Sequence, residues 1–411
     1  MHLTHLALSD FRNYGEAVVE FAPGVMVLVG KNGQGKTNLV EAIAYLSTFT
    51  SHRVSADTTL VRAGMPGAVV RAKVVSGTES ARTQTLELEI IAGRANRARL
   101  NRGQAKPRDL LGILRTVVFA PEDLALVKGD PSERRRLLDE LMVLRTPRLA
   151  GVKSEYEKTL RQRSALLKQA GGRARGGRRD EYAESTLDVW DIQLAAAAAQ
   201  ISAARARLVA DLAPHVADAY RLVSESDRLA TIELQTSLAR EEERLAAGGK
   251  YRRSGEEDQG TLPAPSGEGA SAAELEERLL AVMRALRPAE LERGVTLVGP
   301  HRDELFLAIG ELPAKGYASH GESWSLALAL RIAEFELLRA DDPDPPILIL
   351  DDVFAELDSA RRRRLAGMVG EAEQVFVTAA VAADVPQELN GTRYEVVAGT
   401  VTREEVESSD E

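Results

Sequence analysis

A glycine-rich loop near the start of the chain, set between a strand-like and a helix-like segment, constrains the fold more than any other feature. The apolar run at 25–29 predicts a buried strand, and residues 38–46 predict a helix. The segment between them matches the phosphate-loop pattern G-x-x-x-x-G-K-[ST], formed by Gly30, Lys31, Asn32, Gly33, Gln34, Gly35, Lys36 and Thr37. Strand, glycine loop and helix in this order predict an α/β fold that binds phosphate at the strand's end.

Each section of this loop has a chemical role. The glycines let backbone N–H groups close around phosphates, and the start of the helix contributes its positive dipole end. Lys36 can reach the β- and γ-phosphates, and the Thr37 hydroxyl can ligate Mg²⁺. The alternative is a glycine-rich turn that only resembles the motif. The flanking strand and helix favour nucleotide binding, with ATP and Mg²⁺ as cofactors.

The composition of the chain excludes several classes of protein and of binding site. The 411 residues allow two or three domains, and a hydrophobic content of 44% supports a packed core. The chain has no cysteine, which excludes disulfides and thiolate metal sites, and its six histidines show no metal-ligand spacing. No run approaches the ~20 apolar residues of a membrane span, and the N-terminus lacks a signal pattern, so we expect a cytoplasmic protein without a membrane partner. The net charge of −9 restricts any nucleic-acid contact to local basic patches.

A pair of acids far along the chain completes the predicted site. The apolar run 347–350 is followed by Asp351 and Asp352, as is typical of a Walker B strand. We assign Asp351 to the metal ion and Asp352 to the attacking water, so that Asp352 and Lys36 are the predicted catalytic residues. Two acids that end a core strand in a turn are the simpler alternative. The phosphate loop upstream favours the metal and water roles.

Two further motifs flank this strand. Residues 356–358 (Glu-Leu-Asp) stand where the ATP-binding-cassette superfamily has its D-loop. Ser319, Gly321 and Glu322 open the helical run 326–338, where that superfamily has a serine–glycine signature that meets the γ-phosphate of the other subunit's ATP. On its own, S-x-G-E is more typical of a helix N-cap. Its position shortly before the Walker B acids favours the signature.

The sequence between the motifs predicts an inserted helical region. The periodicity over 148–222, interrupted by a Gly- and Arg-rich stretch at 171–177, predicts two antiparallel helices, either as a short arm or as a subdomain packed on the head. Residues 247–273 have the composition of a disordered linker, and 295–298 read as a strand. We therefore divide the chain into an N-terminal head segment (1–146), a helical arm domain (147–288), a C-terminal head segment (289–403) and an acidic tail (404–411).

Together these motifs resemble the RecF family, in the DNA-repair and chromosome-organising branch of the ATP-binding-cassette superfamily. The arm and the linker carry no distinctive motif, and the wide separation of Thr37 from Ser319 is unlike a transporter cassette. The resemblance rests on segments that follow one another along nearly the whole chain, at 11–14, 30–43, 51–53, 119–124, 127–131, 134–139, 299–303 and 350–358.

The resemblance implies an ABC-type ATPase head assembled from both chain ends, with an inserted α-helical arm. It implies an ATP-dependent homodimer that clamps DNA and hydrolyses ATP slowly, as a weak DNA-stimulated ATPase, in DNA replication, DNA repair and the SOS response. The implied partners are duplex DNA, single-strand/double-strand junctions, RecR and RecO, and functionally RecA, which is loaded at single-strand gaps. By motif position, Arg12 and Asn32 would approach the phosphates, and Ser319 would act across the dimer.

The chain departs from the family pattern at three places. His320 stands where glutamine is usual, and residues 323–325 replace an arginine–threonine pair. No histidine follows the strand at 375–378, so Thr378 stands at the position of the cassette switch histidine. These departures affect the signature contact and the catalytic centre.

Basic clusters are the candidate DNA contacts, against the alternative of solvated helix faces. One is Arg134, Arg135 and Arg136. The second basic cluster lies along the arm, at Arg161, Arg163, Lys168, Arg173, Arg175, Arg178 and Arg179.

Two other functions stay open: an ATP sensor with negligible turnover, because Asp352 replaces the more common glutamate, and a transporter-type ATPase subunit.

Overall fold

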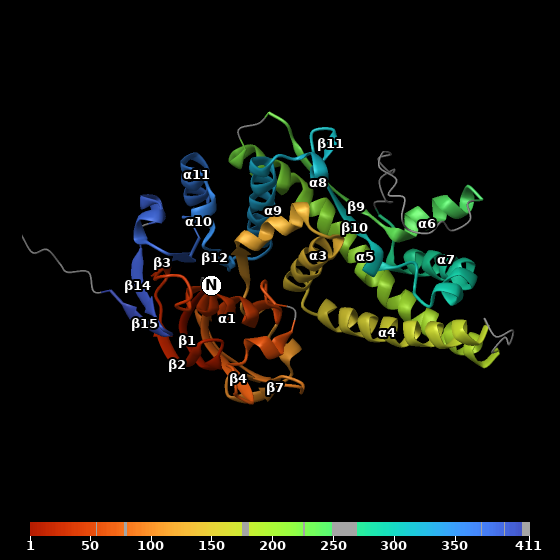
Figure 1. Cartoon of the computed structure of the whole chain (residues 1–411), viewed down its shortest axis with the longest axis horizontal. Coiled ribbons are helices and arrows are strands. Elements are labelled where there is room, and N and C mark those ends of the chain that lie inside the picture. Colours follow the sequence, from red (N-terminus) through yellow and green to blue (C-terminus); the bar gives the residue numbers. More distant parts are fainter. Residues whose placement is uncertain are drawn as a thin grey trace, which may run out of the picture.

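The chain forms a head built around β-sheets, from which a group of long helices extends to one side (Figure 1). Portions of the predicted linker, of the arm tip and of the tail lie outside the described residues. The computed structural model describes residues 1–54, 56–77, 80–174, 181–224, 227–248, 269–370, 372–389 and 391–404, of which 171–174 and 181–184 are described as backbone only.

A six-stranded sheet in the order β15-β14-β3-β13-β12-β8 forms the centre of the head. Its strands pair in parallel except for β15, which is antiparallel to β14. Strands from both chain ends alternate in it, which confirms the predicted α/β head assembled from the two ends. The strands are β3 (Gly24–Val29), β8 (Thr116–Phe119), β12 (Ile347–Asp351), β13 (Gln374–Ala379), β14 (Thr392–Val397) and β15 (Thr400–Arg403).

Two antiparallel sheets accompany it. One has the order β2-β1-β4-β5-β6-β7, and the other has the order β11-β10-β9. The larger consists of β1 (His2–Phe11), β2 (Tyr14–Glu20), β4 (Gly67–Ser76), β5 (Arg82–Ile91), β6 (Arg97–Leu100) and β7 (Gly103–Ala105), and the smaller of β9 (Ala230–Gln235), β10 (Glu304–Ile309) and β11 (Leu312–Pro313).

Helices cover these sheets and build the arm. The α-helices are α1 (Lys36–Thr48), α2 (Leu124–Lys128), α3 (Pro131–Arg145), α4 (Leu149–Ala174), α5 (Glu181–Val223), α6 (Ser237–Ala246), α7 (Ala272–Arg293), α8 (Ala314–Tyr317), α9 (His320–Asp341), α10 (Val353–Glu356) and α11 (Ser359–Val369). Short 3₁₀ helices lie at Asp57–Leu60, Pro107–Leu110, Pro121–Asp123, Pro300–Arg302, Ala382–Asp384 and Gln387–Leu389.

The central strand β12 separates two hydrophobic cores. Successive side chains of a strand point to opposite faces. Ile347 and Ile349 therefore join α1 and the large antiparallel sheet, whereas Leu348 and Leu350 join α3, α5 and α9 on the other face. All four side chains are fully buried, each stabilising the fold by about 1.5–3 kcal/mol. Burial on both faces fixes the end of β12, and hence the position of Asp351.

The predicted helical hairpin is formed by α4 and α5, with α7 packed beside it. Its outer portion stands away from the sheets, whereas the C-terminal portion of α5 packs against α9 and β9 (Figure 1). The periodicity left two alternatives open, a short arm or a subdomain packed on the head. One end of the hairpin matches the first alternative, and the other end matches the second.

Two local predictions differ from the structure. Residues 296–298 of the run 295–298 are buried, but the run forms no strand, because side chains bind its backbone: Glu290 accepts from Leu297 N, and Arg302 donates to Thr296 O. The region predicted as helical also contains β9, which pairs with β10 beyond residue 288. The division of the chain at residues 147 and 288 stays a prediction, and this strand pair crosses the second of these points.

Candidate functional site

The glycine loop leaves β3 and enters α1 with the geometry that the motif requires. Gly35, the N-cap of α1, has a φ of 118°, in the left-handed region that favours glycine. A Cβ added there would lie 2.7 Å from Asn13 Nδ2 and 2.9 Å from Tyr14 Oη. Lys31 and Asn32 are exposed on the outer surface of the loop. Glycine at this point therefore lets the loop pack directly against Asn13 and Tyr14 as it enters α1.

Lys36 is folded over this loop. Its side chain is almost fully buried, and Nζ donates to Gly30 O at 2.8 Å. The ammonium thus lies among loop carbonyl groups, within the cradle that the phosphate loop forms. A phosphate that entered the cradle would meet a positive charge already in place.

The tip of the loop is held by the C-terminal end of the chain. Gln34 O accepts from Gly399 N at 3.1 Å and from Asn13 Nδ2 at 3.0 Å, and Gln34 Oε1 accepts from Ala398 N at 2.7 Å. The turn between β14 and β15 therefore fixes the phosphate loop. Nothing local in the sequence of this turn indicates that role.

The predicted metal ligands meet at the end of β12. Thr37 Oγ1 and Thr378 Oγ1 both donate to Asp351 Oδ1, at 3.0 Å and 2.7 Å. Thr378 Oγ1 also accepts from Asp352 N at 2.9 Å. Asp351 and Thr378 are direct neighbours in the register of β12 and β13. Thr378 thus orients the first acid of the pair.

This donor set fits Mg²⁺. Mg²⁺ prefers oxygen ligands, retains several waters and commonly shares its shell with substrate phosphates. Thr37 and Asp351 supply oxygen atoms beside the phosphate loop. Among the described residues no group of three or more His, Cys, Asp or Glu side chains could hold a metal ion alone. The arrangement therefore suits a cation shared with a nucleotide.

Asp352 begins the turn after β12 with a φ of 51°. Burial raises the pKa of its carboxyl group, and the neighbouring charge of Asp351 adds to this shift. A raised pKa makes a carboxylate a stronger proton acceptor. The position suits the predicted water-orienting role, which stays a prediction.

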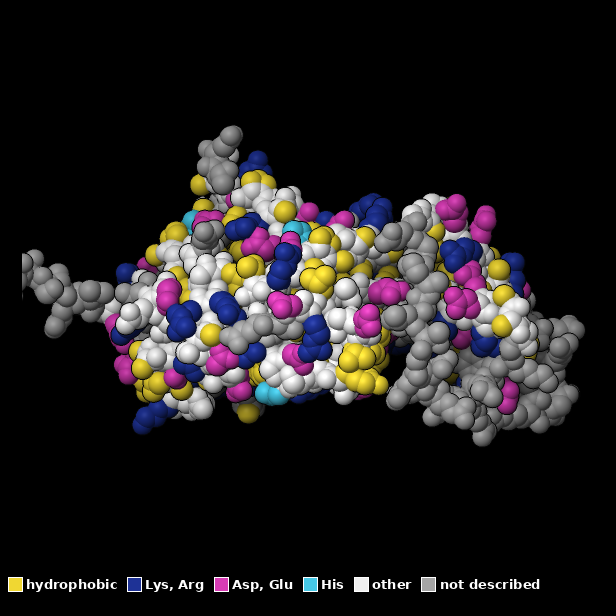
Figure 2. Space-filling model, turned by 90° about the horizontal axis from the view of Figure 1, so that it is seen from above, with side chains coloured by type: hydrophobic (Ala, Val, Ile, Leu, Met, Phe, Trp, Pro, Cys, Tyr) yellow, Lys and Arg dark blue, Asp and Glu magenta, His cyan; other side chains and the backbone are white. Residues whose placement is uncertain are grey.

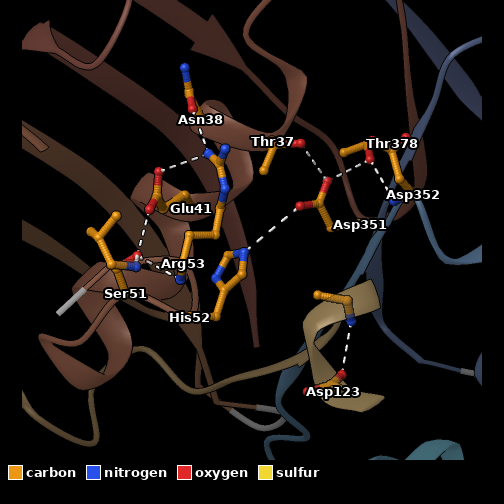
Figure 3. A network of polar contacts seen from close by, with 12 residues as sticks. Thr37, Asn38, Glu41, Ser51, His52, Arg53, Asp123, Asp351, Asp352 and Thr378 are labelled. Carbon is orange, nitrogen blue, oxygen red and sulfur yellow. Dashed lines mark hydrogen bonds and ion pairs between the residues drawn. The ribbon is translucent and has the colours of Figure 1, made fainter. Parts of the chain in front are cut away.

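Arg12 pairs with α1 in the structure, and its approach to the phosphates stays a prediction. Its guanidinium forms a bidentate pair with Glu41 of α1, at 2.9 Å and 2.6 Å, and also donates to Thr59 O. Glu41 is fully buried and also accepts from Ser51 Oγ at 2.5 Å (Figure 3). The structure therefore places Arg12 on the carboxylate that braces α1.

His52 is a site residue that motif reasoning missed. It lies in the loop after α1, and its Nε2 is 3.8 Å from Asp351 Oδ2 (Figure 3). The sequence segment 51–53 was among those that carry the resemblance, but its local pattern gave no sign of a contact with a residue 299 positions away, because the contact forms only when α1 and β12 pack together.

The predicted signature forms the start of α9. Ser319 is its N-cap: Oγ accepts from Glu322 N at 3.2 Å, and the Glu322 carboxylate accepts from Ser319 N at 2.9 Å. Glu322 also pairs with Arg228, and Gly321 lies beside Arg361. Among the residues that the structure describes, no hydrogen bond or ion pair connects this turn to the phosphate loop. Within the described part of this chain, the two motifs are therefore not joined by polar contacts.

The unusual residues of the signature helix point in different directions. His320 lies on the surface, with Nδ1 3.3 Å from Lys128 Nζ. Ser323, Trp324 and Ser325 are buried in the head. Residues 323–325 therefore contribute to the internal packing of the head, whereas His320 lies on the surface beside Ser319.

The structure corrects the DNA-contact prediction for one member of the cluster Arg134–Arg136, whereas contact by Arg135 and Arg136 stays a prediction. Arg134 is buried and makes a bidentate pair with Glu304, at 2.7 Å and 3.0 Å. Arg135 donates to Asp303 O, and Arg136 forms an ion pair with Glu133 at 3.0 Å. Arg134 and Arg135 therefore stabilise the contact of α3 with β10, whereas Arg136 pairs within α3 and stays partly exposed.

The arm cluster is also partly internal. Arg163 is fully buried between Asp191 and Glu290, at 2.6 Å from each. Arg161 and Lys168 are exposed. The side chains of Arg173, Arg175, Arg178 and Arg179 lie outside the described residues. On the face seen in Figure 2, Lys and Arg are interspersed with Asp and Glu, so its described area is not a continuous basic surface.

The fold and this site define a class, the nucleotide-binding heads of SMC-like ATPases. The family model described as RecF/RecN/SMC N terminal domain matches residues 2–397. The "DNA replication and repair protein RecF" of Frankia alni is 56% identical over 404 residues, which cover 98% of this chain and 100% of that relative. The chain belongs to the RecF family.

Two solved structures support this family assignment. The recombination mediator protein RecF-ATPrS in the RecFOR pathway has a TM-score of 0.81, and RecF-ATP of the same pathway has 0.80, each at 26% identity. They cover 98% of this chain and 98% or 99% of their own. Within the described residues, no helix combines the length and apolar character of a membrane span. Family membership replaces the transporter interpretation.

Proposed function

We propose that the chain binds Mg²⁺–ATP at the end of β12 and hydrolyses it slowly. The observation that carries this proposal is the convergence of Thr37, Thr378 and Asp351 beside the phosphate loop and Lys36. Lys36 neutralises phosphate charge, and Asp352 orients the attacking water. A bound Mg²⁺ would supply Lewis-acid stabilisation of the phosphoryl oxygens. The solved relative RecF-ATP supports the nucleotide.

A second copy of the chain completes the site. Ser319 and the free N–H groups at the start of α9 form an anion-binding end, yet they are not joined to the phosphate loop of the same subunit. In an ATP-dependent homodimer each signature would cover the other subunit's nucleotide. This arrangement makes ATP the ligand that closes the dimer.

The dimer would clamp DNA in recombinational repair and replication in the cytoplasm. Its proposed targets are duplex DNA and single-strand/double-strand junctions, and its proposed partners are RecR and RecO, with RecA as the protein that is loaded. The relatives' description as DNA replication and repair proteins and the RecFOR pathway of the solved relatives support this role.

The candidate DNA surface moves from α3 to the edge of the large antiparallel sheet. Residues 92–108 hold six Lys or Arg residues and no acid. The Arg97 and Arg99 side chains are 70% and 56% exposed, although Glu89 and Glu87 of β5 face them. Phosphate contacts of such cations make binding depend on salt, with log K falling by about 0.9 per phosphate.

Charge removal tests this surface. Changing Arg97, Arg102 and Lys106 to Gln should reduce the salt slope of DNA binding by up to about 3. The matched control changes three exposed arginines elsewhere, Arg221, Arg240 and Arg284. Equal slopes for both triple variants would place the DNA contact outside the β6–β7 edge.

Sedimentation with and without ATP and gapped DNA tests the proposed dimer. Wild type should be a monomer alone, a dimer with ATP, and DNA-bound as the dimer. Ser319→Arg should keep ATP binding and lose the dimer, whereas Lys36→Ala should lose ATP. A mixture of the two variants retains one intact composite site and should regain some of the activity. Without such rescue, each site would be complete within one subunit.

An ATP sensor with negligible turnover is the second candidate. It is favoured by Asp352, whose carboxylate is shorter than the more common glutamate and reaches less far toward a water. A single-turnover assay separates the two functions. Release of one phosphate per site supports the ATPase, and persistent bound ATP supports the sensor.

A further inference from the structure

His52 holds two polar atoms in an unusual environment. Its side chain is 11% exposed, and neither ring nitrogen has a hydrogen-bond partner among the described residues. Nε2 lies 3.8 Å from Asp351 Oδ2, too far for a hydrogen bond. Buried polar groups in native proteins are nearly always paired, so an unpaired one requires a reason.

The protein fixes this histidine on both sides. Ser51 Oγ donates to the buried Glu41 carboxylate and accepts from Arg53 N at 3.0 Å. Arg53 in turn donates to Asn38 Oδ1 at 2.9 Å. Glu41 and Asn38 belong to α1, the same helix that carries Thr37. The loop is therefore anchored to the phosphate-binding helix immediately before and after His52 (Figure 3).

The two oxygens of Asp351 have different surroundings. Oδ1 accepts from Thr37 and Thr378, whereas Oδ2 faces His52. Because both oxygens belong to one rigid carboxylate group, a contact to either oxygen restricts the orientation of the whole group. A donor on Oδ2 would complete the set of contacts that fixes the plane of the carboxylate toward a metal ion.

We propose that His52 is a positioning residue for the Mg²⁺–nucleotide site, which donates from Nε2 to Asp351 Oδ2 when the nucleotide is bound. This inference rests on the proposed Mg²⁺–ATP function. Outer contacts of this kind orient metal-binding carboxylates, and their loss typically lowers metal affinity 10–100-fold. The histidine enters from the loop after α1, whereas Thr378 of the neighbouring strand β13 holds the other carboxylate oxygen, Oδ1.

Mn²⁺ binding in the presence of a non-hydrolysable ATP analogue tests the proposal, with Mn²⁺ as the probe read by its electron spin resonance. His52→Phe keeps a ring but removes both nitrogens, and His52→Gln keeps a donor near the position of Nε2. We expect His52→Phe to lower the Mn²⁺ affinity of the nucleotide complex about 10–100-fold. His52→Gln should restore most of it, and His215→Phe, on α5, should match wild type.

Two further measurements separate positioning from packing. Binding of the analogue in EDTA and the thermal melting temperature should be the same for wild type and His52→Phe. Unchanged Mn²⁺ affinity in His52→Phe, or an equal loss in His52→Gln accompanied by a lower melting temperature, would overturn the inference while leaving the proposed function intact. A wild-type chain that binds no Mn²⁺–nucleotide would overturn both.

Discussion

Two polar regions of this molecule are built in opposite ways. The first, the phosphate edge, consists of Lys36, Thr37, His52, Asp351 and Asp352. Its side chains make few hydrogen bonds to other side chains. Lys36 donates to loop carbonyl groups, and both His52 nitrogens lack a hydrogen-bond partner within the described structure. Burial raises the pKa of Asp352, and repulsion from Asp351 adds to this shift.

The second region, the arm-base network, joins α4, α5 and α7. Arg163 is its centre and donates to three partners, Asp191 at 2.6 Å, Thr296 at 2.8 Å and Glu290 at 2.6 Å. Arg287 adds a second cation to Asp191 at 2.5 Å. These opposite charges raise the pKa of Arg163, against the burial that lowers it.

The comparison separates two uses of buried charge. In the arm-base network each charge has its partner inside the chain, so the network fixes one arrangement of the arm helices. At the phosphate edge the charged side chains lie close together but lack a full set of partners within the described residues. They can therefore bind a charged ligand. We therefore expect changes in the network to alter stability first, and changes at the edge to alter ATP chemistry first.

The largest expected effect is on stability, from Arg163→Met. The change keeps the volume but leaves Asp191 and Glu290 as buried charges without their main partner. Loss of one member of such a set typically costs 3–5 kcal/mol. Urea unfolding should show this loss, whereas Arg161→Met, at an exposed site on the same helix, should stay within about 0.5 kcal/mol. Equal unfolding midpoints for the two variants would contradict the proposed role of the network.

Asp352→Asn should give the converse result at the phosphate edge. Asparagine tolerates the left-handed backbone but cannot accept a proton, so hydrolysis should fall by about 10²–10⁴ while ATP binding and the dimer persist. A raised folded-state pKa means that ionised Asp352 opposes folding at pH values above that pKa. At neutral pH the variant should therefore unfold at an equal or slightly higher urea concentration, and phosphate release is measured beside it. Turnover at the wild-type rate would remove Asp352 from the mechanism.

Sequence reasoning succeeded where one short segment contains the whole signal. The phosphate loop needs only its own glycines and the flanking strand and helix, and β12 is recognisable from four apolar residues before two acids. The head built from both ends followed from the family resemblance, and the structure confirms it.

The rest depends on contacts between distant segments. The sequence predicts that Arg134 contacts DNA, but β10 brings Glu304 against it, and the pairing of Arg12 with Glu41 could not be predicted from either local segment. His52 carries no motif of its own and gains its place only from the packing of α1 on β12. The type of a basic or polar residue indicates which partners its side chain can bind. Which partner it does bind depends on the segments that pack beside it in the folded chain.

An intermediate effect is expected from His301, next to the arm-base network. Its Nδ1 lies 2.6 Å from Tyr156 Oη and its Nε2 3.3 Å from Thr296 O. Burial lowers the pKa of His301 from its ordinary 6.5 to about 4, and the charge of Arg302 adds to this. The neutral ring therefore contributes stability that is complete above pH 6.5 and is lost as the pH falls toward 4.

His301→Gln removes this titration. Between pH 7 and pH 4, wild type should lose up to about 3 kcal/mol more stability than the variant, measured as the free energy of unfolding in urea. Parallel pH profiles for wild type and His301→Gln would show that this ring does not titrate on unfolding.

The smallest expected effect on stability comes from two serines with the same local structure. Ser319 caps α9 and Ser271 caps α7, and each forms a capping box with the glutamate three residues later, Glu322 or Glu274. Their N–H···Oγ distances are 3.2 Å and 3.3 Å. As helix caps, the two are equivalent, so Ser→Ala at either position should lower the free energy of unfolding by about 1 kcal/mol.

Only Ser319 belongs to the proposed signature, and the pair therefore separates capping from phosphate contact. A hydroxyl that donates to a charged phosphate contributes about 1.5–3 kcal/mol, so Ser319→Ala should weaken the ATP-dependent dimer roughly tenfold or more at each composite site. Ser271→Ala should leave the dimer unchanged in sedimentation with ATP. If the two variants lose the same stability and both retain the dimer, Ser319 acts only as an N-cap, and the partner's nucleotide is held by other groups at the start of α9.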